Sequence, residues 1–400
     1  MLGEANARGL MTGIFSIIRT FPSTLIWIMK ISTEAKVCAL ALSLMEGIGP
    51  KRAKKLIEFC GGPEAVFQAS KEELNEIPGM HRAALNQLTD PTFLKQAEAE
   101  LNLAFKKNWQ VHFYSESAYP WRMRHCDDGP LLLFQKGNCN LNVPRSLAIV
   151  GTRNMSDYGR DFIRHFSAEL RKFGVHVLSG LAYGVDAQAH RSCLDNDIVN
   201  SAVLAHGLDR VYPHHHRNLA DDIMQGGGSL LTEFPSGTNP DRENFPKRNR
   251  IIAGMSDAVI VVEAARKGGA LITADLANGY NRDVFAVPGR FNDERSEGCN
   301  LLIKSTRAHL LESTRDLAYI MKWDEQEAAK EKQQLELFQN LSALENQVVE
   351  ALGRAKKGLL MDALLAELKL TTSELLSLLM ALELKSVVET LPGPRYRLRS

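Results

Sequence analysis

Short apolar runs alternate with amphipathic segments through the middle of the chain. Turns rich in Gly, Pro, Asn and Ser separate these runs from stretches of helical spacing, such as residues 158–173 and 271–279. Uniformly apolar runs are typical of strands buried on both faces, and here they cover residues 146–150, 175–178, 199–205, 229–232, 258–262 and 284–287. The alternation predicts repeated βα units, and hence an α/β domain with a doubly wound parallel sheet over residues 111–322.

Helical spacing dominates residues 34–110, which predicts an all-α N-terminal domain. Glycine-containing turns interrupt it at residues 45–53 and again at residues 77–83, and each resembles the turn of a helix-hairpin-helix (SAM-like) motif. Backbone N–H groups after such a turn can hold a DNA phosphate. The first turn therefore supplies a possible second DNA contact, made by Gly47, Gly49, Lys51 and Arg52. A purely structural hairpin or a protein-docking module fits the pattern equally well.

The C-terminal part of the chain predicts a winged helix over residues 341–400. It follows a polar, charge-rich linker at residues 323–340 and contains helical spacing at residues 343–352, 359–368 and 373–384, then a hairpin around Gly393. The candidate recognition helix carries Glu374 and Glu383, with Lys385 only at its end. On charge alone, DNA binding and protein binding by this domain are equally open.

The composition indicates a globular protein of several domains but does not identify its ligand. The 400 residues exceed what one core usually serves, and the 44% hydrophobic content is enough for a core in each of several domains. Lys and Arg number 48 against 47 Asp and Glu, so any nucleic-acid affinity must come from local clusters of charge. Six scattered cysteines without a CxxC pair indicate reduced thiols and a cytoplasmic protein.

The first residues are apolar but do not form a membrane span. Arg8, Arg19 and Pro22 interrupt every run before it reaches the roughly 20 residues that a bilayer requires. A secretory signal fits poorly, because no small-residue cleavage site stands clearly after the apolar pieces. We expect residues 1–33 to be a disordered extension, and a start of translation at Met29 is an open alternative.

The loops lack the motifs of the common cofactor sites. The loop after the first central strand is Gly151-Thr152-Arg153-Asn154, which is not the GxGxxG of a dinucleotide site, and no GxxxxGK[ST] occurs. His214, His215 and His216 are adjacent in a turn, where a metal-free loop is the favoured interpretation. We therefore expect no cofactor and no metal.

Cations and one aromatic ring follow the ends of the expected strands. Because the carboxyl ends of parallel strands meet at one edge of a sheet, we expect these residues to converge on one groove. Cations can bind a phosphate chain there and a ring can stack on a base, which predicts single-stranded DNA binding. Taken singly, each cation is better explained as a solvated charge, and the ring as a core residue. The set comprises Arg153, Phe245, Lys247, Arg248, Arg250, Lys267, Gly268 and Gly269.

These segments together resemble the DprA/Smf family of DNA-processing proteins of natural transformation. The resemblance covers about residues 40–311 and rests on ordered motifs: Gly151-Thr152-Arg153, residues 179–190, Glu233-Phe234-Pro235, residues 245–254, residues 271–274 and residues 286–289. It implies an extended Rossmann fold that binds single-stranded DNA in a basic pocket, forms a homodimer and has no enzymatic activity. It further implies that the protein loads the recombinase RecA on incoming strands covered by single-strand-binding protein.

The resemblance also implies roles for individual residues. Arg153, Lys247 and Arg250 would contact phosphates, Phe245 would stack on or near a base, and Arg248 lies in the same motif. Ser179 and Gly180 would donate hydrogen bonds at a helix start, and Gly268 and Gly269 would let the strand approach the next helix. Lys267 stands where the family commonly has a Ser-Gly-Ser type turn, so it would replace the lost hydroxyl contacts. Residues 304–308 also depart from the family's usual Gly-Ala ending.

An enzymatic alternative exists on the same fold. Nucleoside-monophosphate phosphoribohydrolases place a catalytic Glu just after a Pro-Gly-Gly-x-Gly-Thr turn, whereas this chain continues from Gly269 as Ala270-Leu271-Ile272-Thr273-Ala274-Asp275. Fold alone does not determine function, so this alternative stays open. Release of free base from nucleoside monophosphates would support it.

Overall fold

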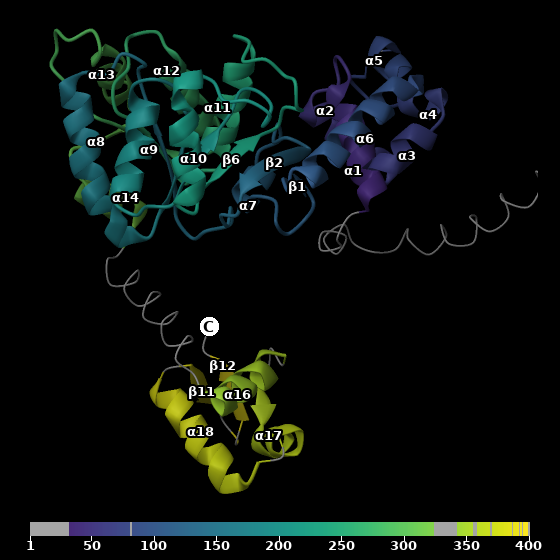
Figure 1. The fold of residues 1–400 in the computed structure, drawn as a ribbon, viewed down its shortest axis with the longest axis vertical. Coiled ribbons are helices and arrows are strands. Elements are labelled where there is room, and N and C mark those ends of the chain that lie inside the picture. The colour runs from purple at the N-terminus through teal and green to yellow at the C-terminus, as the bar shows by residue number, and fades with distance from the viewer. Residues whose placement is uncertain are drawn as a thin grey trace, which may run out of the picture. The chain divides into compact units, whose positions relative to one another are not determined.

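The computed structural model describes residues 32–80, 82–323, 342–354, 358–368, 370–385, 387–391, 393 and 395–398. The chain divides into two compact units, with the boundary in the sequence between Leu317 and Ala318, and each unit is described separately. The first unit holds a helical domain and a large α/β domain, and the second holds a small C-terminal domain (Figure 1). The expected N-terminal extension and the expected linker lie almost wholly outside the described residues.

The N-terminal domain is all-helical, as predicted. Its helices begin at good caps: Ser32 accepts the N–H of Ala35, Ser70 forms a capping box with Glu73, and Asp90 accepts the N–H of Thr92. His81, in the second expected hairpin, lies outside the described residues. The helices are α1 (Thr33–Leu44), α2 (Pro50–Cys60), α3 (Pro63–Gln68), α4 (Lys71–Asn75), α5 (Arg82–Asn86), the 3₁₀ turn η3 (Gln87–Thr89) and α6 (Pro91–Lys106).

The α/β domain alternates strands and helices along the chain, as the hydrophobic pattern predicts. Its strands are β1 (Gln110–Phe113), β2 (Leu132–Gly137), β3 (Ser146–Val150), β4 (His176–Ser179), β5 (Asn200–Val203), β6 (Ser229–Thr232), β7 (Ala258–Val261), β8 (Asp283–Ala286) and β9 (His309–Leu310). Its helices are α7 (Trp121–Arg124), α8 (Asp157–Leu170), α9 (Val185–Asp195), α10 (Arg217–Gln225), α11 (Asn244–Gly254), α12 (Gly269–Gly279), α13 (Glu297–Lys304) and α14 (Thr314–Met321), with 3₁₀ turns η4 (Arg171–Phe173) and η5 (His214–His216).

All of these strands form one sheet in the order β1-β2-β6-β5-β4-β3-β7-β8-β9. The strands β6-β5-β4-β3-β7-β8-β9 all run parallel, which confirms the predicted doubly wound sheet. The sequence analysis missed β2 and β9, and β2 joins β1 and β6 to the sheet by antiparallel pairing. Helices α8, α9 and α10 cover one face, and α11 and α12 cover the other (Figure 1).

The direction of winding reverses next to β3. The chain runs outward from β3 through β4 and β5 to β6, then returns to place β7 on the other side of β3. The connections after β3 and β7 therefore leave the same edge of the sheet toward opposite faces. In open α/β sheets, such a switch point leaves a crevice outside the carboxyl ends of the strands, where ligands bind.

The helical domain packs against the antiparallel edge of the sheet through a continuous apolar core. Leu42 on α1 and Ala97 on α6 belong to the same buried cluster as Phe113 on β1 and Leu132 on β2. This packing brings the turn between α1 and α2 beside the α/β domain. Lys54 on α2 adds hydrogen bonds of 3.2 Å to the carbonyl oxygens of Cys126 and Asp127.

A buried ion pair joins the start of the sheet to its centre. Arg122, 1% exposed, donates to Asp257 through Nε and Nη2 over 2.6 and 2.7 Å. Its remaining donors reach the carbonyl oxygens of Val143 and Pro144, each at 2.8 Å. Asp257 also accepts the N–H of Ser146 over 2.8 Å. The pair thus links α7, the connection before β3 and the residue before β7.

The C-terminal unit is a winged helix, which confirms the prediction. Thr371 caps α18 and forms a capping box with Glu374. In this helix Leu376 and Met380 are exposed, so it presents apolar side chains where a DNA-reading helix usually presents basic ones. The elements are α16 (Ala343–Gly353), β10 (Leu359–Leu360), α17 (Met361–Leu368), α18 (Thr372–Leu384), β11 (Val388–Leu391) and β12 (Arg395–Leu398), with sheet order β10-β12-β11.

Candidate nucleic-acid interface

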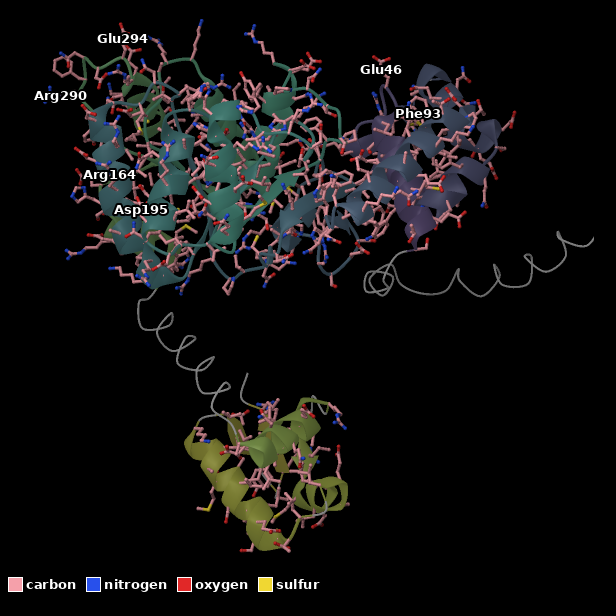
Figure 2. All side chains as sticks on the ribbon, viewed as in Figure 1. Glu46, Phe93, Arg164, Asp195, Arg290 and Glu294 are labelled. Carbon is pink, nitrogen blue, oxygen red and sulfur yellow. The ribbon has the colours of Figure 1, made fainter. Side chains whose placement is uncertain are left out.

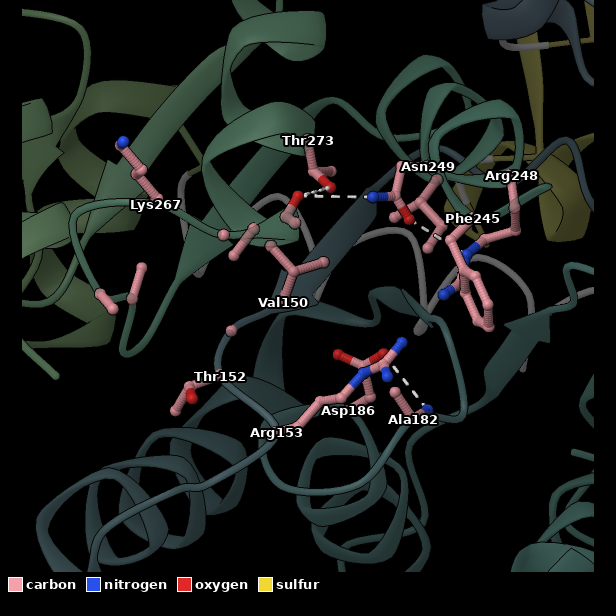
Figure 3. Close-up of a pocket in the computed structure, with 17 residues that line it drawn as sticks. Val150, Thr152, Arg153, Ala182, Asp186, Phe245, Arg248, Asn249, Lys267 and Thr273 are labelled. Carbon is pink, nitrogen blue, oxygen red and sulfur yellow. Dashed lines mark hydrogen bonds between the residues drawn. The ribbon is translucent and has the colours of Figure 1, made fainter. Parts of the chain in front are cut away.

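A hollow opens at the switch point, between the loops after β3 and β7 and the starts of α11 and α12 (Figure 3). It consists of an inner cavity of about 300 Å³ and an adjoining outer cavity of about 870 Å³. We call both together the switch-point groove. The residues that line both parts are Arg153, Phe245, Asn249, Lys267, Gly268 and Gly269.

An arginine and an aromatic ring meet in this groove. Arg153 follows β3 and is exposed, and its guanidinium carbon lies 5.1 Å from the ring centroid of Phe245. Phe245 lies in the first turn of α11 and is partly exposed. The guanidinium carbon of Arg248 lies 5.9 Å from the same centroid, and the ring of Tyr212 lies 6.3 Å away. Cation–π contacts of this kind orient the ring without burying it completely.

The start of α12 forms another wall of the groove. Gly268 occupies the N-cap position in an extended conformation, and no described side chain caps this turn. The carbonyl oxygen of Gly269 accepts Thr273 Oγ1 over 3.1 Å and Asn249 Nδ2 over 3.4 Å, whereas a side chain at Gly268 would meet no described atom within 4 Å. An open helix start beside the exposed Lys267 suits an anion such as phosphate.

Arg248 lines the inner part of the groove, where hydrogen bonds to the protein hold its guanidinium. It is 4% exposed, and its Nη1 donates to the carbonyl oxygens of Gly180 and Val203 over 2.5 and 2.7 Å. Burial lowers the pKa of Arg248 to about 10, and the nearby Asp186 carboxylate opposes that change. Burial likewise raises the pKa of Asp186, which Arg248 opposes. The two groups stabilise each other beneath the groove.

Ser179 and Gly180, for which the resemblance implies hydrogen bonds to DNA, have partners in the protein interior. Ser179 ends β4 and is fully buried, and its hydroxyl donates to the carbonyl oxygen of Ile149 over 2.6 Å. Helix α9 begins only at Val185, so neither residue stands at its first turn. A Cβ built on Gly180 would lie 2.0 Å from Arg248 Nη1. Gly180 therefore makes room for the buried guanidinium.

We predict that Gly180→Ala lowers the free energy of unfolding by about 1–3 kcal/mol, because the added methyl group displaces a guanidinium held by two carbonyl oxygens. Urea unfolding measures the change. Gly279→Ala, where a Cβ would meet no described atom within 4 Å, is the matched control and should change stability by less than about 0.5 kcal/mol. Equal stability of the two variants would contradict the role of Gly180.

Lys247 and Arg250 lie on the other side of α11, so the cations expected in one cluster line two different cavities. They line a separate cavity of about 450 Å³, whose other walls come from the turn between α1 and α2 and from β2. We call it the hairpin cavity. Lys247 is exposed there, whereas Arg250 is 9% exposed and donates to Glu233 Oε2 and to the carbonyl oxygen of Asp128. Successive helical residues differ by about 100° in direction, which separates positions 247 and 250 from 245, 248 and 249.

The four residues of the possible second DNA contact have different surroundings. Gly47, with a φ of 77°, and Gly49 line the hairpin cavity. Lys51 Nζ lies 3.3 Å from Asp127 Oδ2 in an exposed pair, and Arg52 Nη1 donates to the carbonyl oxygen of Gly47 over 2.7 Å. An exposed pair of this kind exchanges readily for a phosphate.

Two further cations of the groove were missed by the sequence analysis. Arg242 and Arg266 are exposed and line its outer part. Arg266 directly precedes Lys267, and Arg242 stands three residues before Phe245, so proximity to the motif residues was a usable signal. Among the described residues, no cluster of three or more His, Cys, Asp or Glu side chains could hold a metal ion, and no helix could span a bilayer.

Comparison with known proteins extends the resemblance beyond these motifs. The family model for DNA recombination-mediator protein A matches residues 110–322, and that for the DprA winged helix domain matches residues 330–394. The DprA protein of Mycobacterium tuberculosis is 32% identical over 383 residues, 94% of this chain and 95% of that protein. The Smf protein of Synechocystis is 36% identical over 290 residues, 70% of this chain and 71% of that protein.

A solved structure agrees with these matches. The crystal structure of DNA processing protein A from Streptococcus pneumoniae aligns with 74% of this chain and 99% of that chain, at 32% identity and a TM-score of 0.61. The family model covers more than half of the chain, and the mycobacterial relative matches it nearly from end to end. The chain therefore belongs to the DprA/Smf family of DNA-processing proteins.

Proposed function

We propose that the protein binds single-stranded DNA in the switch-point groove. The observation that carries the proposal is the exposed Arg153 guanidinium 5.1 Å from the Phe245 ring, beside the uncapped start of α12. Arg153, Lys267 and the helix start supply contacts for consecutive phosphates, and the ring supplies a stacking surface. A base can reach that ring only when it is unpaired, so single strands are preferred over duplex.

Binding would replace one contact of the ring by another. Arg153 is exposed, so its guanidinium can leave Phe245 for a phosphate when a base stacks on the ring. Arg248 cannot follow, because two carbonyl oxygens hold it. The fixed cation thus keeps the ring oriented while the mobile one binds the strand.

The experiment that tests this proposal is fluorescence anisotropy of a labelled oligo-dT and its duplex counterpart at several salt concentrations. We expect selective binding to the single strand, with an affinity that falls as salt rises. Arg153→Ala/Lys267→Ala should weaken binding and make the slope of log K against log salt shallower by about 1.4, since each lost phosphate contact contributes about 0.7.

Arg164→Ala/Arg191→Ala is the matched control, because both arginines are exposed on helices of the same domain and Arg164 lies on α8 (Figure 2). It should leave affinity and slope unchanged. Equal slopes for the wild type and the Arg153→Ala/Lys267→Ala variant would overturn the assigned phosphate contacts.

We further propose the finer role that the family resemblance implies: a cytoplasmic homodimer that protects incoming DNA and loads RecA on it during natural transformation. Support comes from membership of the family rather than from the geometry of the groove. Purified protein should accelerate RecA filament assembly on strands coated with single-strand-binding protein. Acceleration that persists in the Arg153→Ala/Lys267→Ala variant would contradict a role of the groove in loading.

The enzymatic alternative gains no support from the groove. Its acidic lining residues among those described are Asp186 and Asp275. Asp186 accepts the N–H of Ala182 over 3.3 Å and faces the buried Arg248, while Asp275 forms an exposed pair with Arg307 at 2.9 Å. We propose binding without a chemical step, and release of free base from nucleoside monophosphates would contradict it.

A further inference from the structure

The hairpin cavity contains a buried acceptor that lacks a donor. Glu233 follows β6, and its side chain, 13% exposed, lines the cavity. Its Oε2 accepts Arg250 Nη2, whereas its Oε1 is buried and has no hydrogen-bond partner among the described residues. A carboxylate oxygen left unpaired in the interior is costly, so such an atom points to a missing donor.

The walls around Glu233 suit a partly apolar ligand. Ile48 from the turn between α1 and α2 and Leu132 from β2 are buried hydrophobic residues, and both line the cavity. Lys247 lines it too and is exposed, which places a cation within reach of a negatively charged group. Apolar walls, an acceptor and a nearby cation together match a nucleobase with its phosphate.

The cavity lies within reach of the strand proposed for the groove. Phe245 and Pro246 line the groove, and Lys247, the next residue of α11, lines the hairpin cavity. A chain of phosphates that crosses the first turn of α11 therefore passes from one site to the other. Helix α11 then serves both sites, one on each side.

We propose that the hairpin cavity binds one further unpaired base of the same strand, whose exocyclic amino group donates to Glu233 Oε1 while the adjacent phosphate contacts Lys247. This inference rests on the proposed single-strand binding. It makes the protein selective for bases that carry an amino group. Thymine lacks that group, and its single N–H lies between two carbonyl oxygens that a carboxylate would repel.

The test compares oligo-dC with oligo-dT, since both are pyrimidines of similar size. In the wild type we expect oligo-dC to bind about 10-fold more tightly, because a hydrogen bond to a buried charged group is worth about that factor. In Glu233→Gln, the amide oxygen can accept Arg250 and the amide nitrogen then becomes a donor at the position of Oε1. The preference for dC should therefore disappear or reverse toward dT, whose carbonyl oxygens accept that donor.

A second variant avoids the ion pair altogether. Gly49 lines the cavity and has an ordinary φ of −75°, and a Cβ there would meet no described atom within 4 Å. Gly49→Leu should fill the cavity and remove the preference for dC, so that dC and dT bind with equal affinity. Thermal unfolding of each variant checks its folding.

The possible outcomes separate the two proposals. Failure of the wild type to bind either oligonucleotide would overturn the proposed function itself. Binding of dC and dT with equal affinity, or a dC preference that both Glu233→Gln and Gly49→Leu retain, would overturn the hairpin cavity as a base site while leaving the groove intact. Loss of the preference in both folded variants would support it.

Discussion

Asp257→Ala is expected to lower the free energy of unfolding of the first unit by about 3–5 kcal/mol, the usual cost of removing one partner of a buried ion pair. Arg122 is 1% exposed and gives two of its hydrogen bonds to this carboxylate. Without Asp257, a positive charge remains in the interior beside the carbonyl oxygens of Val143 and Pro144 and the ring of Trp121, 4.4 Å away. The N–H of Ser146, at the start of β3, also loses its acceptor.

Urea unfolding followed by circular dichroism measures this change. The control is Asp275→Ala, which removes the exposed pair with Arg307 at 2.9 Å and should cost less than about 1 kcal/mol. A comparable small loss for Asp257→Ala would show that the Arg122 charge is accommodated by other groups. Arg122→Met/Asp257→Leu, which removes both charges, should recover much of the stability.

Phe245→Ala is expected to weaken binding of oligo-dT by about 1–3 kcal/mol, or about 5- to 150-fold, because it removes the stacking surface for a base. The ring is partly exposed in the groove and is contacted by the exposed Arg153. The loss should appear in affinity and leave the salt slope nearly unchanged, since no phosphate contact is removed. Anisotropy titrations at several salt concentrations measure both quantities.

Phe105→Ala is the matched control, because Phe105 lies on α6 in the helical domain and its ring is 59% exposed. It should not alter DNA binding. Thermal unfolding separates the two interpretations of Phe245: an unchanged affinity with a large loss of stability would identify the ring as a core residue and remove it from the DNA site.

The central strands were predictable because their patterns are local. Residues 146–150 and 229–232 are apolar runs bounded by turn residues, and the structure has β3 and β6 at these positions. Strand β2 was missed although Leu132, Leu133 and Phe134 form an apolar run. Its membership of the sheet depends on antiparallel pairing of Phe134 with Thr232, far away in the sequence. No local pattern distinguishes such a strand from an apolar connection.

The groove was predictable only in part. Arg153, Phe245 and Lys267 do line one groove, because Arg153 and Lys267 stand in the loops after β3 and β7 and Phe245 lies in the first turn of α11. The helical period of α11 could have separated Lys247 and Arg250 from Phe245 without any structure. It could not have revealed that Gly180, Val203 and Asp128 supply carbonyl oxygens to Arg248 and Arg250, since these acceptors come from segments distant in the sequence.

The sequence by itself determined the family, the alternation of strands and helices, and the loops that carry the cations, because periodicity and motifs are properties of neighbouring residues. Only the tertiary structure decided which cations are available to a ligand. Arg153 and Lys247 remain exposed, while Arg248 and Arg250 are buried by segments far away in the chain. The tertiary structure also creates the hairpin cavity, because that space exists where the helical domain packs beside the sheet. Charge neutralisation and cavity shape arise from long-range packing, which no local pattern of residues encodes.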